Sequence, residues 1–178
     1  WANLVLNNDR VVVEAHRESW KTFFFSRSFT LWYALNKPGS RILLISFSEE
    51  QAKDNLNWIK LQVENNPVLR KCLYPDSNSY TWQKTKLHFK NGSTIDAKGF
   101  GTSLRGGHYH LIIGDDLLKD SGAMPPEEME NFWFAVVTPA SLKTGGRILV
   151  VGTPLFAGDL LEKIEAQESY VVRKYPAY

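Results

Sequence analysis

Residues 99–116 read GFGTSLRGGHYHLIIGDD and contain a glycine-rich turn with one arginine, a short apolar run and two adjacent carboxylates. The apolar run, Leu111–Ile113, is too short for a helix and predicts a buried strand. Such a strand delivers the residues that follow it to the carboxyl edge of a sheet, where open α/β folds bind ligands. The sequence therefore predicts a ligand site that contains Asp115 and Asp116.

Two adjacent carboxylates at the end of a buried strand need a compensating partner, because desolvation disfavours their charges. A hydrated Mg²⁺ can supply it, since this ion prefers one or two carboxylates together with phosphate oxygens. The alternative is a structural role, in which Asp116 caps a helix and Asp115 stabilises a turn.

Length and composition favour one soluble globular domain. The chain has 178 residues, of which 43% are hydrophobic and 22% charged. A net charge of +2 gives no support for nucleic-acid binding by itself, so a DNA-binding face would have to be a local patch. The single cysteine, Cys72, excludes an internal disulfide and fits a reducing compartment. The sequence contains no apolar run of membrane-spanning length and no signal peptide, and its start at Trp1 predicts a piece of a longer protein.

Strands and helices are expected to alternate along the first half of the chain. The pattern predicts strands at 9–15 and 41–47, each followed by a helix, at 22–36 and 48–65. Ser48 is the expected N-cap of the second helix. This order favours a mainly parallel sheet with helices on both faces, a three-layer αβα fold.

The second half adds a hairpin and further αβ units. Residues 86–97 predict a β-hairpin with a two-residue turn at Asn91-Gly92, inserted into the parallel sheet. After the acidic pair we expect a helix from Pro125 that ends at Pro139, a strand at 146–151, a helix at 159–167 and a strand at 170–173.

Three of the expected strands carry polar residues at their ends. The first is followed by AHRESWKT, residues 15–22, which places Lys21 and Thr22 at a helix N-terminus. Free N–H groups, the helix dipole and the lysine suit an anion there, and the threonine can bind Mg²⁺. The other two ends carry the acidic pair and Gly152-Thr153. Together these are the parts of a P-loop nucleotidase.

The first of these motifs matches G-x-x-x-x-G-K-[ST] poorly, because Ala15 and Trp20 occupy the two glycine positions. Taken alone, Lys21 and Thr22 can simply begin an amphipathic helix. Their place after one buried strand and upstream of another that ends in two acids favours the phosphate loop.

Taken together, the motifs resemble the large terminase subunit, the DNA-packaging motor ATPase of tailed bacteriophages. That family carries a degenerate Walker A motif, often with alanine for the first glycine and an arginine within the loop. The resemblance covers residues 9–160 and rests on the following segments: the phosphate loop at 15–22, the strand and helix start ISFSEEQA at 45–52, the glycine and arginine segment at 99–106, the Walker B strand with its acids at 111–116, and the coupling motif VVGTP at 150–154.

The resemblance implies an ASCE-type P-loop NTPase fold and a Mg²⁺-dependent ATPase that drives double-stranded DNA into a procapsid. It also implies a portal protein and a small terminase subunit as partners, a homo-oligomeric ring, no membrane association, and the host cytoplasm as location. Residues 1–178 would form a single ATPase domain. The family's adenine-binding segment would precede it, and the nuclease domain would follow it.

The resemblance also implies a role for each site residue. The nucleotide phosphates would bind the loop formed by His16, Arg17, Glu18, Ser19, Trp20, Lys21 and Thr22. Lys21 would neutralise the β- and γ-phosphates, Thr22 and Asp115 would hold Mg²⁺, and Asp116 would orient or deprotonate the attacking water. Two departures stand out: Trp20 replaces a glycine, and Asp116 stands where many motor ATPases have a glutamate.

Three further residues have two interpretations each. Arg17 can contact the γ-phosphate or be a solvated surface residue. Arg105 can be a trans-acting arginine finger, which raises turnover about 10³- to 10⁵-fold, or form a surface salt bridge. Thr153 can sense the γ-phosphate or end a strand.

His108 and His110 have the spacing of metal ligands but lack a third ligand and are interpreted as structural. The lysines at 84, 86, 90 and 98 can contact DNA phosphates or form a solvated face.

Other functions remain as alternatives. A superfamily-2-like helicase or other P-loop translocase also carries paired acids after a buried strand, but the Ala-His or Ala-Asp expected after them is absent. A nucleotide-binding module in which Trp20 has abolished hydrolysis is the alternative from a different class. A carboxylate nuclease is less favoured, because only one acid pair is well placed.

Overall fold

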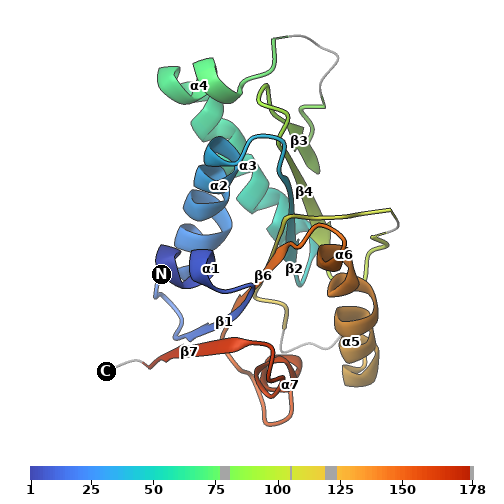
Figure 1. Ribbon diagram of the computed structural model, residues 1–178. Helices are drawn as coiled ribbons and strands as arrows, with labels where there is room; N and C mark the ends of the chain where they lie inside the picture. Colours follow the sequence, from blue (N-terminus) through green and yellow to red (C-terminus); the bar gives the residue numbers. More distant parts are fainter. Residues whose placement is uncertain (77–80, 105, 119–123, 177–178) are drawn as a thin grey trace.

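The computed structural model describes residues 1–76, 81–104, 106–118 and 124–176 and has a single seven-stranded sheet at its centre (Figure 1). The strand order is β3-β4-β2-β5-β6-β1-β7. All neighbouring strands are parallel except β3 and β4, which form an antiparallel hairpin. The strands are β1 (Arg10–Ala15), β2 (Arg41–Ser46), β3 (Lys86–His88), β4 (Thr94–Gly99), β5 (Leu111–Asp115), β6 (Arg147–Gly152) and β7 (Val171–Tyr175).

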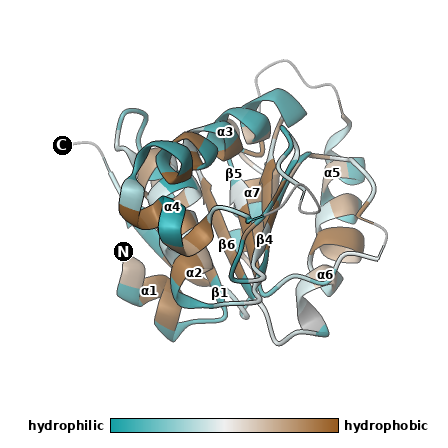
Figure 2. Ribbon diagram, turned by 90° about the horizontal axis from the view of Figure 1, so that it is seen from above, coloured by the Kyte–Doolittle hydropathy of each residue, from teal (hydrophilic) through white to brown (hydrophobic). Residues whose placement is uncertain are grey.

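Helices cover both faces of this sheet. The first face carries α1 (Ala2–Asn7), the π-helix η1 (Phe23–Phe29), α2 (Thr30–Asn36), α3 (Glu49–Asn65) and α4 (Pro67–Leu73). The second carries α5 (Pro126–Phe132), the π-helix η2 (Trp133–Val137), α6 (Pro139–Leu142) and α7 (Leu160–Glu165). In Figure 2, α1 to α4 and α5 to α6 lie on opposite sides of the strands. No helix among the described residues is long and apolar enough to cross a membrane.

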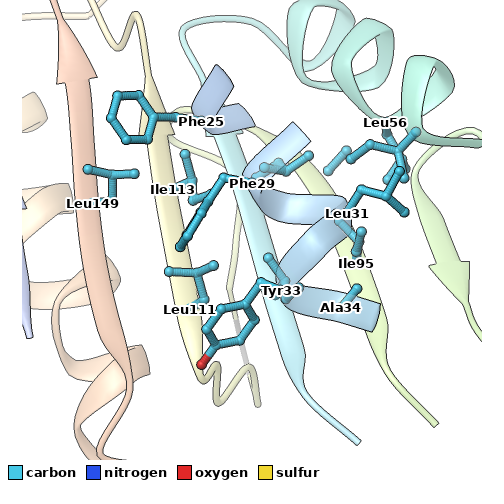
Figure 3. Close-up of a cluster of buried hydrophobic side chains, with 14 of the residues drawn as sticks. Phe25, Phe29, Leu31, Tyr33, Ala34, Leu56, Ile95, Leu111, Ile113 and Leu149 are labelled. Atoms are coloured by element: carbon cyan, nitrogen blue, oxygen red, sulfur yellow. The ribbon is translucent and has the colours of Figure 1, made fainter. Parts of the chain in front are cut away.

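The side-chain alternation of the strands produces the three layers. On β5, Leu111 and Ile113 pack into the core on the first face, whereas Ile112 between them packs into the core on the second. Figure 3 shows the first of these cores, in which Phe25 and Phe29 lie over the strands. Because both faces are covered, the central strands are apolar throughout, as a parallel sheet requires. The predicted three-layer αβα fold with an inserted hairpin is confirmed.

The register brings the predicted polar strand ends together. Asp115 at the end of β5 pairs with Ser46 of β2 on one side and with Val151 of β6 on the other. On β1, Glu14 pairs with Gly152 of β6. The carboxyl ends of these four parallel strands therefore meet at one edge of the sheet, and β6 lies between the two strands that carry the phosphate loop and the acidic pair.

The helix predicted from Pro125 to Pro139 is present as α5 and η2, which end at Val137, and Pro139 is the first residue of a further helix, α6, that was not predicted. Proline is tolerated there because the first residues of a helix lack intrahelical partners for their N–H groups. The same reason explains the unpredicted α4, since Pro67 begins a new helix after Asn66, whose side chain accepts hydrogen bonds from the N–H groups of Val68 and Leu69.

The prediction of a two-residue turn is wrong, although the predicted hairpin is present. The ladder of β3 and β4 ends at the pair His88–Thr94, so a longer loop, 89–93, connects the strands. The loop packs against the end of α2, because the Asn91 amide and the Ser93 hydroxyl both donate to the carbonyl of Ala34, at 2.8 and 3.1 Å. The short helix α1, whose Val5 is buried in the first core, was not predicted either.

Replacing Gly146 with alanine is expected to destabilise the fold. Gly146 precedes β6, and a Cβ at this position would overlap the carbonyl oxygen of Tyr109 on the backbone that leads into β5. Overpacking of this kind costs about 1–3 kcal/mol. Gly152→Ala, at the other end of β6, is the matched control because its Cβ would meet only Leu161, at 3.5 Å. Urea unfolding of both variants measures the difference, and equal stabilities would contradict the prediction.

Candidate functional site

The loop between β1 and the following helix contains two non-glycine residues with a left-handed backbone. Glu18 and Trp20 have φ angles of 67° and 61°, in the left-handed region that glycine normally occupies. Trp20 is 74% exposed, and its ring packs edge-to-face with the ring of Phe23, 5.9 Å away between centroids. Trp20 thus adopts the backbone conformation of the expected glycine and keeps its side chain out of the loop.

Lys21 and Thr22 begin the helical segment that continues through η1 and α2 to Asn36. Lys21 is only 6% exposed, and its Nζ donates to the carbonyl oxygen of His16 at 3.4 Å. The loop therefore folds back over its own lysine. A buried ammonium with one weak acceptor leaves donors free for an anion.

Thr22 and Asp115 join two of the predicted strand ends. The hydroxyl of Thr22 donates to Oδ1 of Asp115 at 3.1 Å. Asp115 is 1% exposed, and burial raises the pKa of its carboxyl from the usual 3.8 to about 6, with a further increase from the charge of Asp116. Thr22 and Lys21 act in the opposite direction but do not compensate. A cation beside Asp115 would therefore stabilise its charged form.

Asp116 has a strained backbone that fixes it between two strands. Its φ is 46°, and its N–H donates to the carbonyl of Val151 at 2.9 Å while its carbonyl accepts from the N–H of Phe47 at 3.3 Å. No hydrogen bond from a described residue reaches its carboxylate, which lines the pocket described below. This carboxylate is free to bind a water molecule or a ligand.

Thr153 links the third strand end to the first. Its hydroxyl donates to the carbonyl of Ala15 at 2.9 Å, so the end of β6 is tied to the start of the phosphate loop. A rearrangement of either segment would break or move this bond.

A pocket of about 910 Å³ lies over these strand ends. It brings together eight of the predicted site residues: Arg17, Glu18, Ser19, Trp20, Lys21, Thr22, Asp116 and Thr153. His16 is exposed outside the pocket, and Asp115 lies beneath Thr22 without lining the pocket wall. Arg105 lies outside the described residues. The opposite wall is apolar and comes mainly from α7 and the segment before it, with Leu155, Leu160, Leu161 and Ile164.

Sequence analysis missed Asn55, a polar residue in contact with Asp115, and Arg27, which contacts Asn55. Asn55 of α3 is 2% exposed, and its amide donates to Oδ2 of Asp115 at 3.4 Å. Its Oδ1 accepts from Nε of Arg27 in η1 at 2.9 Å. A signal for Asn55 exists in the sequence, because it lies on the face of α3 that is otherwise apolar, with Ala52, Leu56, Ile59 and Val63.

Three other candidates, His110, Lys86 and Lys90, have partners within the fold. Nδ1 of His110 accepts from the N–H of Arg41 at 3.0 Å, and the described residues contain no group of three or more His, Cys, Asp or Glu side chains suited to a metal. Lys86 pairs with Asp96 at 3.1 Å, and Lys90 pairs with Asp76 at 2.8 Å. These two lysines of the hairpin are therefore partly neutralised.

The donors near Thr22 fit a magnesium ion that shares its ligands with a phosphate. They comprise one hydroxyl and one buried carboxylate in contact, with a second carboxylate next in sequence. Mg²⁺ typically takes one or two carboxylates and completes its coordination with waters and phosphate oxygens. Because the protein alone offers so few ligands, an ion held here would need the nucleotide as well.

This sheet, with a lysine and threonine loop after β1 and paired acids after β5, has the fold of a P-loop NTPase. Comparison with known proteins finds similarity to phage large terminases. The chain is 24% identical over 181 residues to the large terminase subunit of Enterobacteria phage T3, a match that covers 96% of this chain and 30% of the phage protein. The resemblance to large terminases predicted from the motifs is confirmed.

Solved structures agree on the fold. The ATPase domain of the Thermus phage P74-26 large terminase superposes with a TM-score of 0.66 at 18% identity, covering 96% of this chain and 76% of that domain. The large terminase of a thermophilic bacteriophage in complex with ADP gives a TM-score of 0.60 at 15% identity, with 96% and 41% covered. No protein-family model matches the sequence. The chain spans about three tenths of the length of its curated relative.

Proposed function

We propose that this chain binds and hydrolyses ATP with Mg²⁺ as the motor domain of a phage large terminase. The observation that carries the proposal is the contact between Thr22 and the buried carboxylate of Asp115 beside Lys21, under a pocket large enough for a nucleotide. These three side chains come from the two strand ends that a P-loop NTPase uses. The ADP complex of a structurally similar terminase supports nucleotide as the ligand.

Each residue then has a defined task. Lys21 and the N–H groups of the loop bind the β- and γ-phosphates, and Thr22 and Asp115 hold the metal ion. When bound, Mg²⁺ neutralises charge on the phosphates. Asp116 holds the attacking water and accepts its proton. Arg17 in the loop also contacts phosphate, because its exposed guanidinium lines the pocket.

Thr153 is the proposed sensor of the nucleotide state. Its hydroxyl already bonds to the carbonyl of Ala15, where the phosphate loop begins. Phosphates that shift the loop would change this bond and thereby the position of the segment after β6. This segment leads to α7, whose Leu160 and Leu161 form part of the pocket wall.

The proposed motor acts on double-stranded DNA and moves it into a procapsid in the host cytoplasm. A ring of subunits, a portal protein and a small terminase subunit are the proposed partners, and Arg105 is the proposed finger acting on a neighbour's nucleotide. The conformation of Trp20 argues against the alternative of an inactivated module, because Trp20 adopts the left-handed backbone that a glycine would have there. DNA-stimulated ATPase activity without strand separation would favour the motor, whereas strand separation would favour a helicase.

Replacing Lys21 with alanine tests nucleotide binding directly. A hydrogen bond to a charged group contributes about 1.5–3 kcal/mol, so MgATP affinity should fall about 10- to 100-fold. Isothermal titration calorimetry of wild type and variant measures this change. Lys53→Ala is the matched control, because Lys53 is a partly exposed lysine that pairs with Glu49 on α3. Equal affinity of wild type and Lys21→Ala would show that the loop does not bind phosphate.

A further inference from the structure

Arg27 lines the same pocket but belongs to none of the motifs that indicated the function. It lies in η1, five residues after Thr22, and is half-buried. Its Nε donates to Oδ1 of Asn55 at 2.9 Å, and the amide of Asn55 donates to Oδ2 of Asp115 at 3.4 Å. A chain of contacts therefore links Arg27 to the carboxylate beneath the phosphate loop.

The orientation of the Asn55 amide is fixed by its two neighbours. An arginine can only donate and an ionised carboxylate can only accept, so the oxygen must face Arg27 and the nitrogen must face Asp115. Asn55 is almost completely buried, at 2% exposure, and cannot exchange these partners for water. The Asn55 amide therefore fixes the orientation of the Arg27 guanidinium through its Nε.

The two terminal nitrogens of Arg27 remain available. Within the described part of the chain, no hydrogen bond or ion pair reaches them. A half-buried guanidinium that lacks a carboxylate partner has lost part of its hydration without compensation. A bound anion would supply that compensation. The planar fork of arginine matches the oxygens of a phosphate, to which it can donate two parallel hydrogen bonds.

The position of Arg27 indicates which phosphate it meets. Through Asn55 it packs against α3, and the same helix contributes Gln51 to the pocket one turn earlier. Asn55 also links Arg27 to Asp115, and Asp116, the next residue in the sequence, lines the same pocket. Asp116 is the proposed base, which must act at the phosphate that is cleaved, and this is the terminal one.

The helix that carries Arg27 is a π-helix, in which the N–H of residue i+5 bonds to the carbonyl of residue i. Thr30 adds a side-chain bond with the same spacing, from its hydroxyl to the carbonyl of Phe25 at 3.0 Å. Phe25, Ser26 and Phe29 are buried against the sheet, whereas Arg27 turns toward α3. Single π-turns are often found at functional sites, which agrees with a role for this segment.

We propose that Arg27 is a substrate-contacting residue that binds the terminal phosphate of the nucleotide held by its own subunit. This inference rests on the proposed nucleotide-binding function. It adds an arginine within the subunit to the two that the sequence indicated, Arg17 in the loop and Arg105 before β5. If the inference is correct, Arg27 strengthens the binding of a nucleoside triphosphate but not that of a diphosphate.

The affinities for MgATP and MgADP of wild type and of Arg27→Gln test the proposal. Calorimetry should show a loss of about tenfold or more for MgATP and of less than threefold for MgADP, because only the triphosphate reaches the guanidinium. Arg27→Lys keeps the charge but not the fork and should give an intermediate ratio. Arg70→Gln, at an arginine of α4 that packs on Tyr74, is the matched control and should change neither affinity.

Equal losses for MgATP and MgADP in Arg27→Gln would overturn the inference and assign Arg27 a purely structural role. If this variant does not fold, the ratio measured for Arg27→Lys decides the question. If wild type binds MgATP through Lys21 but both Arg27 variants keep the wild-type ratio of MgATP to MgADP affinity, the inference about Arg27 is wrong and the proposed function stands. A wild-type chain that binds neither nucleotide refutes the proposed function, and this inference with it.

Discussion

Replacing Asp116 with asparagine is expected to lower ATP turnover about 10²- to 10⁴-fold and to leave MgATP affinity within a few-fold of wild type. The reason is that Asp116 is the proposed base, and an amide cannot accept the proton of the attacking water. Its carboxylate lines the pocket, and no described residue bonds to it. Substrate binding is assigned instead to the phosphate loop, so the effect should appear in kcat rather than in KM.

Asparagine is the suitable substitution because of the backbone at this position. Asp116 has a φ of 46°, and asparagine is among the few non-glycine residues that adopt this region readily. The hydrogen bonds of its backbone to Val151 and Phe47 can then remain. Asp54→Asn, at an exposed site on α3, controls for the loss of a carboxylate. Steady-state phosphate release measures turnover, and a decrease smaller than tenfold would show that another group accepts the proton.

Much of the fold was predictable because the central strands are buried on both faces. Residues such as Val11–Val13 and Leu111–Ile113 form apolar runs that only a covered parallel sheet explains. Once the strands are parallel, their carboxyl ends must meet at one edge, so Lys21, Thr22 and Asp115 could be brought together from sequence order alone. The hydrogen bond between Thr22 and Asp115 confirms that these two strand ends meet.

The remaining features depend on contacts that sequence patterns do not encode. Asn55 lies on an apolar helix face, and only the position of the sheet beneath it reveals that Asp115 is its partner. Arg27 lies in a π-helix, and nothing in the sequence FFFSRSF indicates one. Trp20 departs from the glycine expected in a phosphate loop, and only the folded chain reveals that it adopts a left-handed conformation there.

Replacing Asp115 with asparagine is expected to change how stability depends on pH in the metal-free, nucleotide-free protein. The pKa of Asp115 is about 6 in the folded chain, against an ordinary value of 3.8, mainly because the carboxyl is buried. Between about pH 4 and pH 6 the folded state therefore holds the proton that the unfolded state has released. Wild-type stability falls as pH rises through this window, and the loss is complete above about pH 6.

The difference between the two pKa values corresponds to roughly 3 kcal/mol. Asp115→Asn carries no titrating group at this position, so its stability relative to wild type should increase by about this amount between pH 4 and pH 7. The absolute stability of the variant is a poorer measure, because an amide that keeps its oxygen toward Asn55 turns its nitrogen toward the Thr22 hydroxyl, which must then accept a hydrogen bond instead of donating one. Urea unfolding at several pH values isolates the pH-dependent part, and Asp54→Asn again controls for the lost carboxylate.

A stability difference that does not vary with pH would show that Asp115 is ionised throughout this range in the folded chain. The buried carboxylate would then already be compensated without a metal ion, which would remove the electrostatic reason for placing Mg²⁺ beside it.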